Sequence, residues 1–276
     1  MLLVYALTRA TQHGWVTGTT IGLLLASLAL VASFVVIEAR SKAPLLPLGI
    51  FRLRTLTASN VSGLLLAGSM FSQFFLLTLY MQQVLHYSAL KTGVAYIALT
   101  LTIIAFSGVA QALATRVGVR RILTTGMLVS AAGLVLYARL PVNGHYFWDL
   151  FPAFILSGLG LALAFVPMSI GALTGVTETE AGVASGLINT SQQVGGAIGV
   201  AVATTIATTA TSHYVSAHVG ATALGGGALT HGFQITFYVL AAIAAAGGVV
   251  AATLTERRPP AEVLEVAEGE ALFEAA

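Results

Sequence analysis

The sequence has no cysteine and very little charge. Without cysteine it can form neither a disulfide nor a thiolate metal site. Charged residues make up 8 % of the chain, whereas a soluble domain carries about 25 %. Ten acidic and 12 basic side chains are too few for the polar surface of a soluble protein of 276 residues, which excludes an ordinary cytosolic enzyme. The net charge of +2 is too small to indicate a nucleic-acid partner.

Long apolar runs lie between these few charges. Hydrophobic residues make up 57 % of the chain, and a helix needs about 20 predominantly apolar residues to cross a bilayer. Seven runs qualify, and none has an Asp, Glu, Lys or Arg in its interior. They are Thr17–Ile37, Leu56–Tyr80, Thr92–Thr115, Ile122–Ala138, Leu150–Val176, Gly182–Thr209 and Phe233–Thr255. Because the runs do not alternate apolar and polar residues, we predict an all-α membrane protein with about seven transmembrane helices, not a β-barrel.

The other segments are assigned by their length and charge. Residues 1–16 read as the tail of a truncated helix and an outer loop, with a surface-lying N-terminus as the alternative. Residues 17–40 contain the first, extra transmembrane helix. Residues 41–56 are apolar but interrupted by proline and arginine, so we expect them to lie at the cytoplasmic membrane surface. Residues 256–276 are rich in glutamate and are expected to form a disordered cytoplasmic tail.

Lysine and arginine in the loops predict the orientation, because cytoplasmic loops of membrane proteins are enriched in both. One set of alternate loops holds nine of them: Arg40, Lys42, Arg52, Arg54, Arg116, Arg120, Arg121, Arg257 and Arg258. The other set holds three: Arg9, Lys91 and Arg139. We therefore expect the first set and the C-terminus to be cytoplasmic, in a multi-pass protein of the plasma membrane. The loop over residues 211–232 is then expected outside.

The last six runs, within residues 57–255, divide into two groups of three. Because three crossings end on the opposite side from where they began, the second group starts on the other side of the membrane. This is the topology of the inverted repeats that are common in secondary transporters. We therefore predict a six-helix bundle built from 3+3 inverted repeats.

Two of the runs carry a stripe of polar residues along one helical face. At 100° per residue, the stripe of the second run spans about 40° and that of the sixth run about 80°. The first stripe consists of Ser62, Ser69, Gln73 and Tyr80. The second consists of Ser185, Asn189 and Gln192, followed by Gly196 and Gly199. We predict that the polar residues of both stripes line a substrate cavity; the alternative is that they join neighbouring helices.

Proline and glycine predict where helices bend or pack closely. Pro167 lacks a backbone N–H and should kink the fifth run, where Gly158 and Gly160 would let the helix bend as a gate. The alternative is a static kink. Two G-x-x-x-G patterns are typical of close packing between membrane helices. Their members and one neighbouring glycine are Gly182, Gly186, Gly195, Gly196 and Gly199.

The sequence has no recognisable catalytic or metal-binding pattern. It contains no His-x-x-x-His pair, no Gly-x-Ser-x-Gly motif and no carboxylate pair within a run, so we do not predict an enzyme. His213, His218 and His231 share the expected outer loop, but their spacings of five and 13 do not match a helical pair of zinc ligands. We therefore expect no metal and no organic cofactor.

A basic loop joins the third and fourth runs. It reads Ala-Leu-Ala-Thr-Arg-Val-Gly-Val-Arg-Arg-Ile-Leu over residues 112–123. This resembles the cytoplasmic loop G-x-L-A-D-R-x-G-R-R-x-x-L of the major facilitator superfamily. The loop residues that we single out are Arg116, Gly118, Arg120 and Arg121. Glycine permits the tight turn, and the arginines hold the inner end through charged contacts and lipid phosphates. The family's aspartate is Thr115 here, so the acidic partner in the loop is absent.

Further stretches resemble one group within that superfamily, the fourteen-span drug:proton antiporters of the EmrB/QacA type. Residues 180–199, Glu-Ala-Gly-Val-Ala-Ser-Gly-Leu-Ile-Asn-Thr-Ser-Gln-Gln-Val-Gly-Gly-Ala-Ile-Gly, are similar to the penultimate span of that group. Residues 43–56 and 80–93 are similar to other parts of it. The resemblance implies that the seven runs are spans eight to fourteen. The N-terminal six-helix domain would then be missing from this sequence and would be its partner, together with the lipid bilayer.

The resemblance also implies a function. Such transporters export small apolar or cationic molecules by alternating access, with the proton gradient as the energy source. Phe71, Phe74 and Phe75 would add stacking surface for these substrates, or else contact lipid and neighbouring helices. Proton coupling needs a titratable group within the membrane, and no run here contains a carboxylate, so we do not expect this chain to run antiport alone. The alternative is a stand-alone or decayed half-transporter that needs a partner half.

Overall fold

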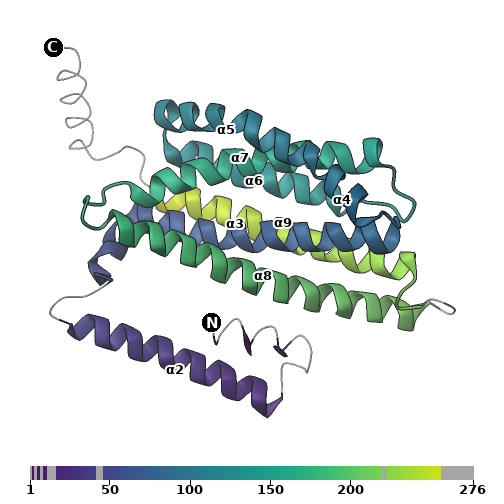
Figure 1. Cartoon of the computed structure of the whole chain (residues 1–276), viewed down its shortest axis with the longest axis horizontal. Coiled ribbons are helices and arrows are strands. Elements are labelled where there is room, and N and C mark those ends of the chain that lie inside the picture. Colours follow the sequence, from purple (N-terminus) through teal and green to yellow (C-terminus); the bar gives the residue numbers. More distant parts are fainter. Residues whose placement is uncertain are drawn as a thin grey trace.

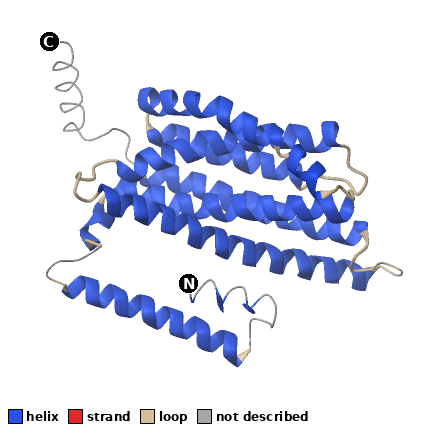
Figure 2. Ribbon diagram, viewed as in Figure 1, coloured by secondary structure: helices blue, strands red, loops and turns tan. Residues whose placement is uncertain are grey.

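The computed structural model describes residues 17–41 and 46–255 apart from 219 and 221, together with residues 2, 5, 6, 9 and 10. Every regular element in this described part of the chain is a helix (Figure 2). The predicted tail over residues 256–276 lies outside the described residues, as do most of residues 1–16 and part of the expected interfacial segment.

In the part of the chain that the structure describes, seven helices are long and apolar enough to cross a membrane, which confirms the predicted spans. The first of them, α2 (Gly18–Arg40), lies beside a bundle of the other six (Figure 1). The bundle consists of α3 (Arg54–Leu79), α5 (Ile97–Val117), α6 (Val119–Tyr137), α7 (Phe151–Leu173), α8 (Ala181–Ala217) and α9 (Gly226–Leu254). Short elements link or extend these helices: the 3-10 helix η1 (Leu48–Arg52), the π-helical segments η2 (Tyr80–Val84) and η3 (Tyr146–Leu150), and α4 (Ala89–Ala95).

Two predicted boundaries are wrong, both at the α8–α9 connection. Helix α8 has 37 residues and ends at Ala217 instead of Thr209, and α9 begins at Gly226 instead of Phe233. His213 and His231 are therefore helical and not in a loop. Polar residues ended the apolar run but not the helix, in which Ser and Thr hydroxyls bond to carbonyls of the preceding turn. A helix of this length rises about 56 Å, more than the roughly 30 Å hydrocarbon core, so α8 tilts or extends beyond it.

The six helices of the bundle form two layers. In the first layer α8 packs on α3, α3 on α7 and α7 on α5. In the second layer α9 and α6 pack on each other; α9 also contacts α3 and α8, and α6 contacts α7 and α5. Exchanging α3 with α7, α5 with α8 and α6 with α9 turns the α3–α8, α3–α9 and α8–α9 contacts into the α7–α5, α7–α6 and α5–α6 contacts, and leaves α3–α7 and α6–α9 unchanged. This symmetry is that of the predicted 3+3 inverted repeat.

Glycine brings the backbones of neighbouring helices into direct contact. A Cβ atom on Gly195 would overlap the Leu64 carbonyl of α3, and one on Gly199 would overlap the Gly68 carbonyl. The α6–α7 pair uses the same device, because a Cβ on Gly133 would lie 2.6 Å from the Ser157 Oγ. Helices in lipid gain nothing from hydrophobic association, so such close contacts supply much of the packing energy.

The first of the two G-x-x-x-G patterns does not pack as predicted. A Cβ atom on Gly182 or Gly186 would have no other group within 4 Å. The buried residue of this turn is Ala184, which belongs to a small apolar cluster with Ile50 and Leu56. The two glycines therefore lie on the side of α8 that no described helix covers. Gly196, in contrast, lies against the Phe71 ring of α3, so the second pattern and its neighbour do form a helix contact.

The α3–α8 contact predicts opposite effects for two sets of glycine substitutions. Gly199→Ala and Gly195→Ala should each destabilise the protein by about 1–3 kcal/mol, because the new methyl group must push two backbones apart. In this chain by itself, Gly186→Ala should instead be neutral or slightly stabilising, because alanine favours helix by up to about 1 kcal/mol and its methyl group would have no described group within 4 Å. The difference is measured by heating the three variants in detergent and recording, by size-exclusion chromatography, how much of each protein stays folded. Equal stability of all three would show that α3 and α8 are not packed backbone to backbone.

Candidate functional site

The predicted polar stripe on α3 lies inside the bundle. The Ser62 hydroxyl donates a hydrogen bond to the Gly247 carbonyl (3.4 Å), and Ser69 donates to the Leu240 carbonyl (3.3 Å), both on α9. Both serines are buried. Each hydroxyl therefore holds α3 against the second layer of the bundle.

The other two residues of this stripe contact α7 and the loop before it. Gln73 accepts a hydrogen bond from the Ser157 hydroxyl through its Oε1 atom (3.3 Å), and Tyr80 donates to the Pro141 carbonyl (2.6 Å). Gln73 is 3 % exposed, and its Nε2 atom has no hydrogen-bond partner among the described residues. This placement does not fit the predicted cavity wall. The spacing identified a polar face correctly, but it does not tell whether such a face meets water or a neighbouring backbone.

The predicted stripe on α8 lies differently, because two of its three polar residues are exposed. Ser185 and Asn189 are exposed and Gln192 is half-buried. Gly182, Gly186 and Gln193 are also exposed, at spacings that place them on the same side of the helix as Ser185 and Asn189. We call these five residues the polar face of α8: Gly182, Ser185, Gly186, Asn189 and Gln193. They combine two exposed amides with two glycines that would let another helix approach closely.

A cavity of about 220 Å³ lies between α3, α5 and α7. Its lining residues are Met70, Ile103, Ser107, Leu161, Ala162, Phe165 and Val166. No lining residue comes from α6 or α9, so the cavity lies on the side of the first layer away from the second. The sequence analysis missed these residues because six of the seven are apolar and look like ordinary packing residues.

The residues predicted to gate α7 bring that helix close to its neighbours. Gly158 faces α5, where a Cβ atom would lie 2.8 Å from the Leu99 carbonyl oxygen, and Gly160 faces Ser130 of α6. Helix α7 is continuous through Pro167, so the proline does not break it. Because proline has no N–H, the carbonyl of Leu163 has no helical partner four residues on. A gating movement of this helix stays a prediction.

Gly118 alone joins α5 to α6 in the basic loop. Its φ of 98° lies in the region that glycine adopts readily and other residues avoid, which agrees with the expected tight turn. Arg116 and Arg121 are exposed and Arg120 is half-buried, all at the same end of the bundle. The arginines are therefore placed where they can reach lipid phosphates.

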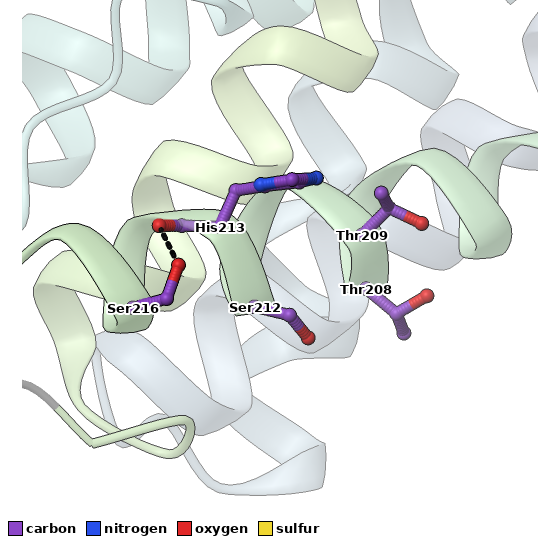
Figure 3. Close-up of a pocket in the computed structure, with 5 residues that line it drawn as sticks. All are labelled: Thr208, Thr209, Ser212, His213 and Ser216. Carbon is purple, nitrogen blue, oxygen red and sulfur yellow. Dashed lines mark hydrogen bonds between the residues drawn. The ribbon is translucent and has the colours of Figure 1, made fainter.

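A second, shallow hollow lies on α8 near its C-terminal end (Figure 3). All five lining residues come from this one helix: Thr208, Thr209, Ser212, His213 and Ser216. Its only internal contact in the figure is the hydrogen bond from Ser216 to the His213 carbonyl (2.8 Å). A single helix cannot surround a ligand. Within the described residues no three metal-ligating side chains come together, and the nearby His218 stacks on the Tyr214 ring at 4.0 Å.

Comparison with known proteins identifies the family. Residues 2–200 match the model of the family described as Major Facilitator Superfamily. The chain belongs to this superfamily. The arrangement of its six-helix bundle agrees with this membership, which supports the prediction that the protein is not an enzyme. The loop over residues 112–123, which first indicated the superfamily, lies within the matched region.

Several antibiotic resistance and export proteins of the superfamily are similar in sequence. The puromycin resistance protein pur8 of Streptomyces alboniger is 34 % identical over 263 residues, which cover 94 % of this chain and 52 % of that protein. The lincomycin resistance protein of Streptomyces lincolnensis is 32 % identical over 72 % of this chain and 41 % of its own length. The cephamycin export protein CmcT of Amycolatopsis lactamdurans is 33 % identical over 79 % of this chain and 47 % of its own length. The chain thus spans about half the length of these relatives.

The turn at Gly118 yields a test of the loop in this superfamily member. Gly118→Ala should destabilise the protein by about 1–2 kcal/mol, because a Cβ atom is strained at positive φ. Gly108→Ala on α5 is the matched control, because its Cβ atom would meet nothing within 4 Å and its φ is ordinary. Thermal stability in detergent should fall for the first variant only. A Gly118→Ala protein as stable as Gly108→Ala would mean that the loop does not need this turn.

Proposed function

We propose that the bundle α3–α9 is one of the two helical bundles of an efflux transporter for small apolar or cationic molecules, which works by alternating access. The observation that carries the proposal is the polar face of α8. The names of the relatives, which describe antibiotic resistance and export, support outward transport.

The polar face of α8 differs from the surfaces that suit lipid. On α9 the exposed Val249 is apolar (59 %), and α2 exposes residues such as Leu28 (66 %). Asn189 and Gln193 present amides instead. Because an amide in hydrocarbon without a partner costs several kcal/mol, this face is expected to meet water or a second bundle. The glycines beside the amides suit close approach of that second bundle.

The energy source in this proposal is the proton gradient, but the proton-binding acid is expected in the other bundle. Helices α3, α5, α6, α7, α8 and α9 contain no Asp or Glu. Glu38, near the end of α2, is buried and accepts a hydrogen bond from the Leu46 N–H, so it links the end of α2 to the residues just before η1. A titratable group must be exposed to each side in turn, and the described spans of this bundle offer no carboxylate for it.

We further propose that the protein lies in the plasma membrane with its arginine-rich loops and C-terminus in the cytoplasm, as the positive-inside rule indicates. In this orientation the loop with Gly118 faces inward, and the short loop over residues 218–225 faces outward. The second bundle would be a six-helix domain, either joined to this one or supplied by a partner chain. A band near twice 28.4 kDa on immunoblots of native membranes would support a joined domain, and a band near 28.4 kDa would support a partner chain.

Substitution of two amides separates transport from packing. Asn189→Ala should change resistance to at least one exported compound by about five-fold, as loss of one hydrogen bond would, with normal protein level. Gln73→Ala should instead lower stability by about 1–3 kcal/mol, because it leaves buried groups unpaired. Drug-resistance assays and immunoblots of the complete transporter measure both effects. If Asn189→Ala lowers only the protein level, the polar face of α8 is a packing surface and the proposal loses its main support.

A further inference from the structure

The cavity between α3, α5 and α7 has a chemical character that a ligand must match. Its floor is formed by the buried Leu161 and Ala162, and Phe165, 41 % exposed, stands at its rim. The half-buried Met70 adds a flexible thioether, which packs well against aromatic rings. No charged side chain lines the cavity. Its wall is therefore suited to an uncharged apolar group.

The volume limits the size of that group. An apolar cavity of about 150 Å³ is known to bind benzene. The present cavity, at about 220 Å³, has more than this volume but less than twice this volume. It therefore has room for a group of one or two fused rings and not for a large polycyclic molecule.

Ser107 is the one polar side chain in the lining, and its hydroxyl proton is already in use. The Oγ atom donates to the Ile103 carbonyl at 2.6 Å. A hydroxyl that donates within its own helix keeps its lone pairs as acceptors. Ser107 therefore offers the ligand an acceptor and no donor, so the complementary ligand group is an O–H or N–H.

We propose that this cavity is a binding subsite for a flat, uncharged one- or two-ring group that carries a hydrogen-bond donor. The ligand's ring lies between Met70 and Phe165, over Ala162, and its donor bonds to the Ser107 hydroxyl oxygen. The proposal rests on the proposed function, since it places part of an exported molecule on the side of the bundle away from α6 and α9. It also separates two substrate classes: none of the described lining residues is acidic and could neutralise a positive charge, so we expect an uncharged ring to bind here in preference to a cation.

The test measures binding of 2-naphthol to the full chain in lipid nanodiscs, by the change in its fluorescence. Partitioning into lipid is subtracted with empty discs. The wild-type protein should show a saturable component that naphthalene competes for and tetrapropylammonium does not. Ser107→Ala should weaken 2-naphthol by about five-fold, the effect of one neutral hydrogen bond, and leave naphthalene unchanged.

Two variants fill the cavity from different directions. Ala162→Phe fills it from the floor and should abolish the saturable component. Because Ala162 is buried and this change could disturb folding, Ile103→Phe, at a half-buried wall position, serves as the second filling variant. Ala105→Phe is the matched control, because Ala105 is exposed on the same helix and does not line the cavity. It should bind 2-naphthol as the wild type does.

The subsite is overturned by any of three results: no saturable binding, wild-type binding in both filling variants, or competition by tetrapropylammonium as strong as that by naphthalene. An equal effect of Ser107→Ala on both aromatic probes overturns the acceptor role. Binding of 2-naphthol without drug efflux by the complete transporter would refute the proposed function and leave the subsite standing. Efflux without 2-naphthol binding would refute the subsite alone.

Discussion

Backbone contact through glycine is the interaction on which the bundle depends. In a bilayer the lipid tails are as apolar as leucine, so helices associate through close packing and hydrogen bonds. Here Gly195 and Gly199 place α8 directly on the carbonyls of α3, and Gly160 places α7 on Ser130 of α6. The buried Ser62 and Ser69 hydroxyls of α3 also bond to carbonyls of α9. These contacts join α8 to α3 within the first layer and hold α3 and α7 against the second layer.

The fixed bundle separates its polar side chains into two groups. The first group is buried and hydrogen-bonds to neighbouring helices; it consists of Ser62, Ser69 and Gln73. The second group, Asn189 and Gln193, is exposed on α8. The bundle therefore presents one polar face and one apolar cavity. The six helices of the bundle contain no Asp or Glu. The proposed alternating-access mechanism assigns the proton-binding group to a second bundle.

The sequence predicted the fold well and the site only in part. Apolar runs bounded by charged residues located all seven described spans, and the residues around Gly118 indicated the superfamily. Both predictions succeeded because each depends only on residues that are close together in the sequence. The helix ends near His213 failed because hydropathy records polarity and not hydrogen bonding. Periodicity could not separate the buried stripe with Gln73 from the exposed one with Asn189, since burial depends on which helix packs against which face. The cavity beside Ser107 has no sequence signal, because three helices far apart in the chain create it from apolar residues.

The most direct test asks what the polar face of α8 meets in the membrane. Asn189→Cys and, separately, Val249→Cys on α9 can each carry a spin label in the assembled transporter, because these 276 residues contribute no other cysteine. Collision rates with oxygen, which dissolves in lipid, and with a water-soluble nickel chelate report the surroundings of each label. The account predicts that oxygen reaches the label at Asn189 much less than the one at Val249. Equal oxygen access at both positions would place Asn189 in lipid and contradict a second bundle or a water-filled path at this face.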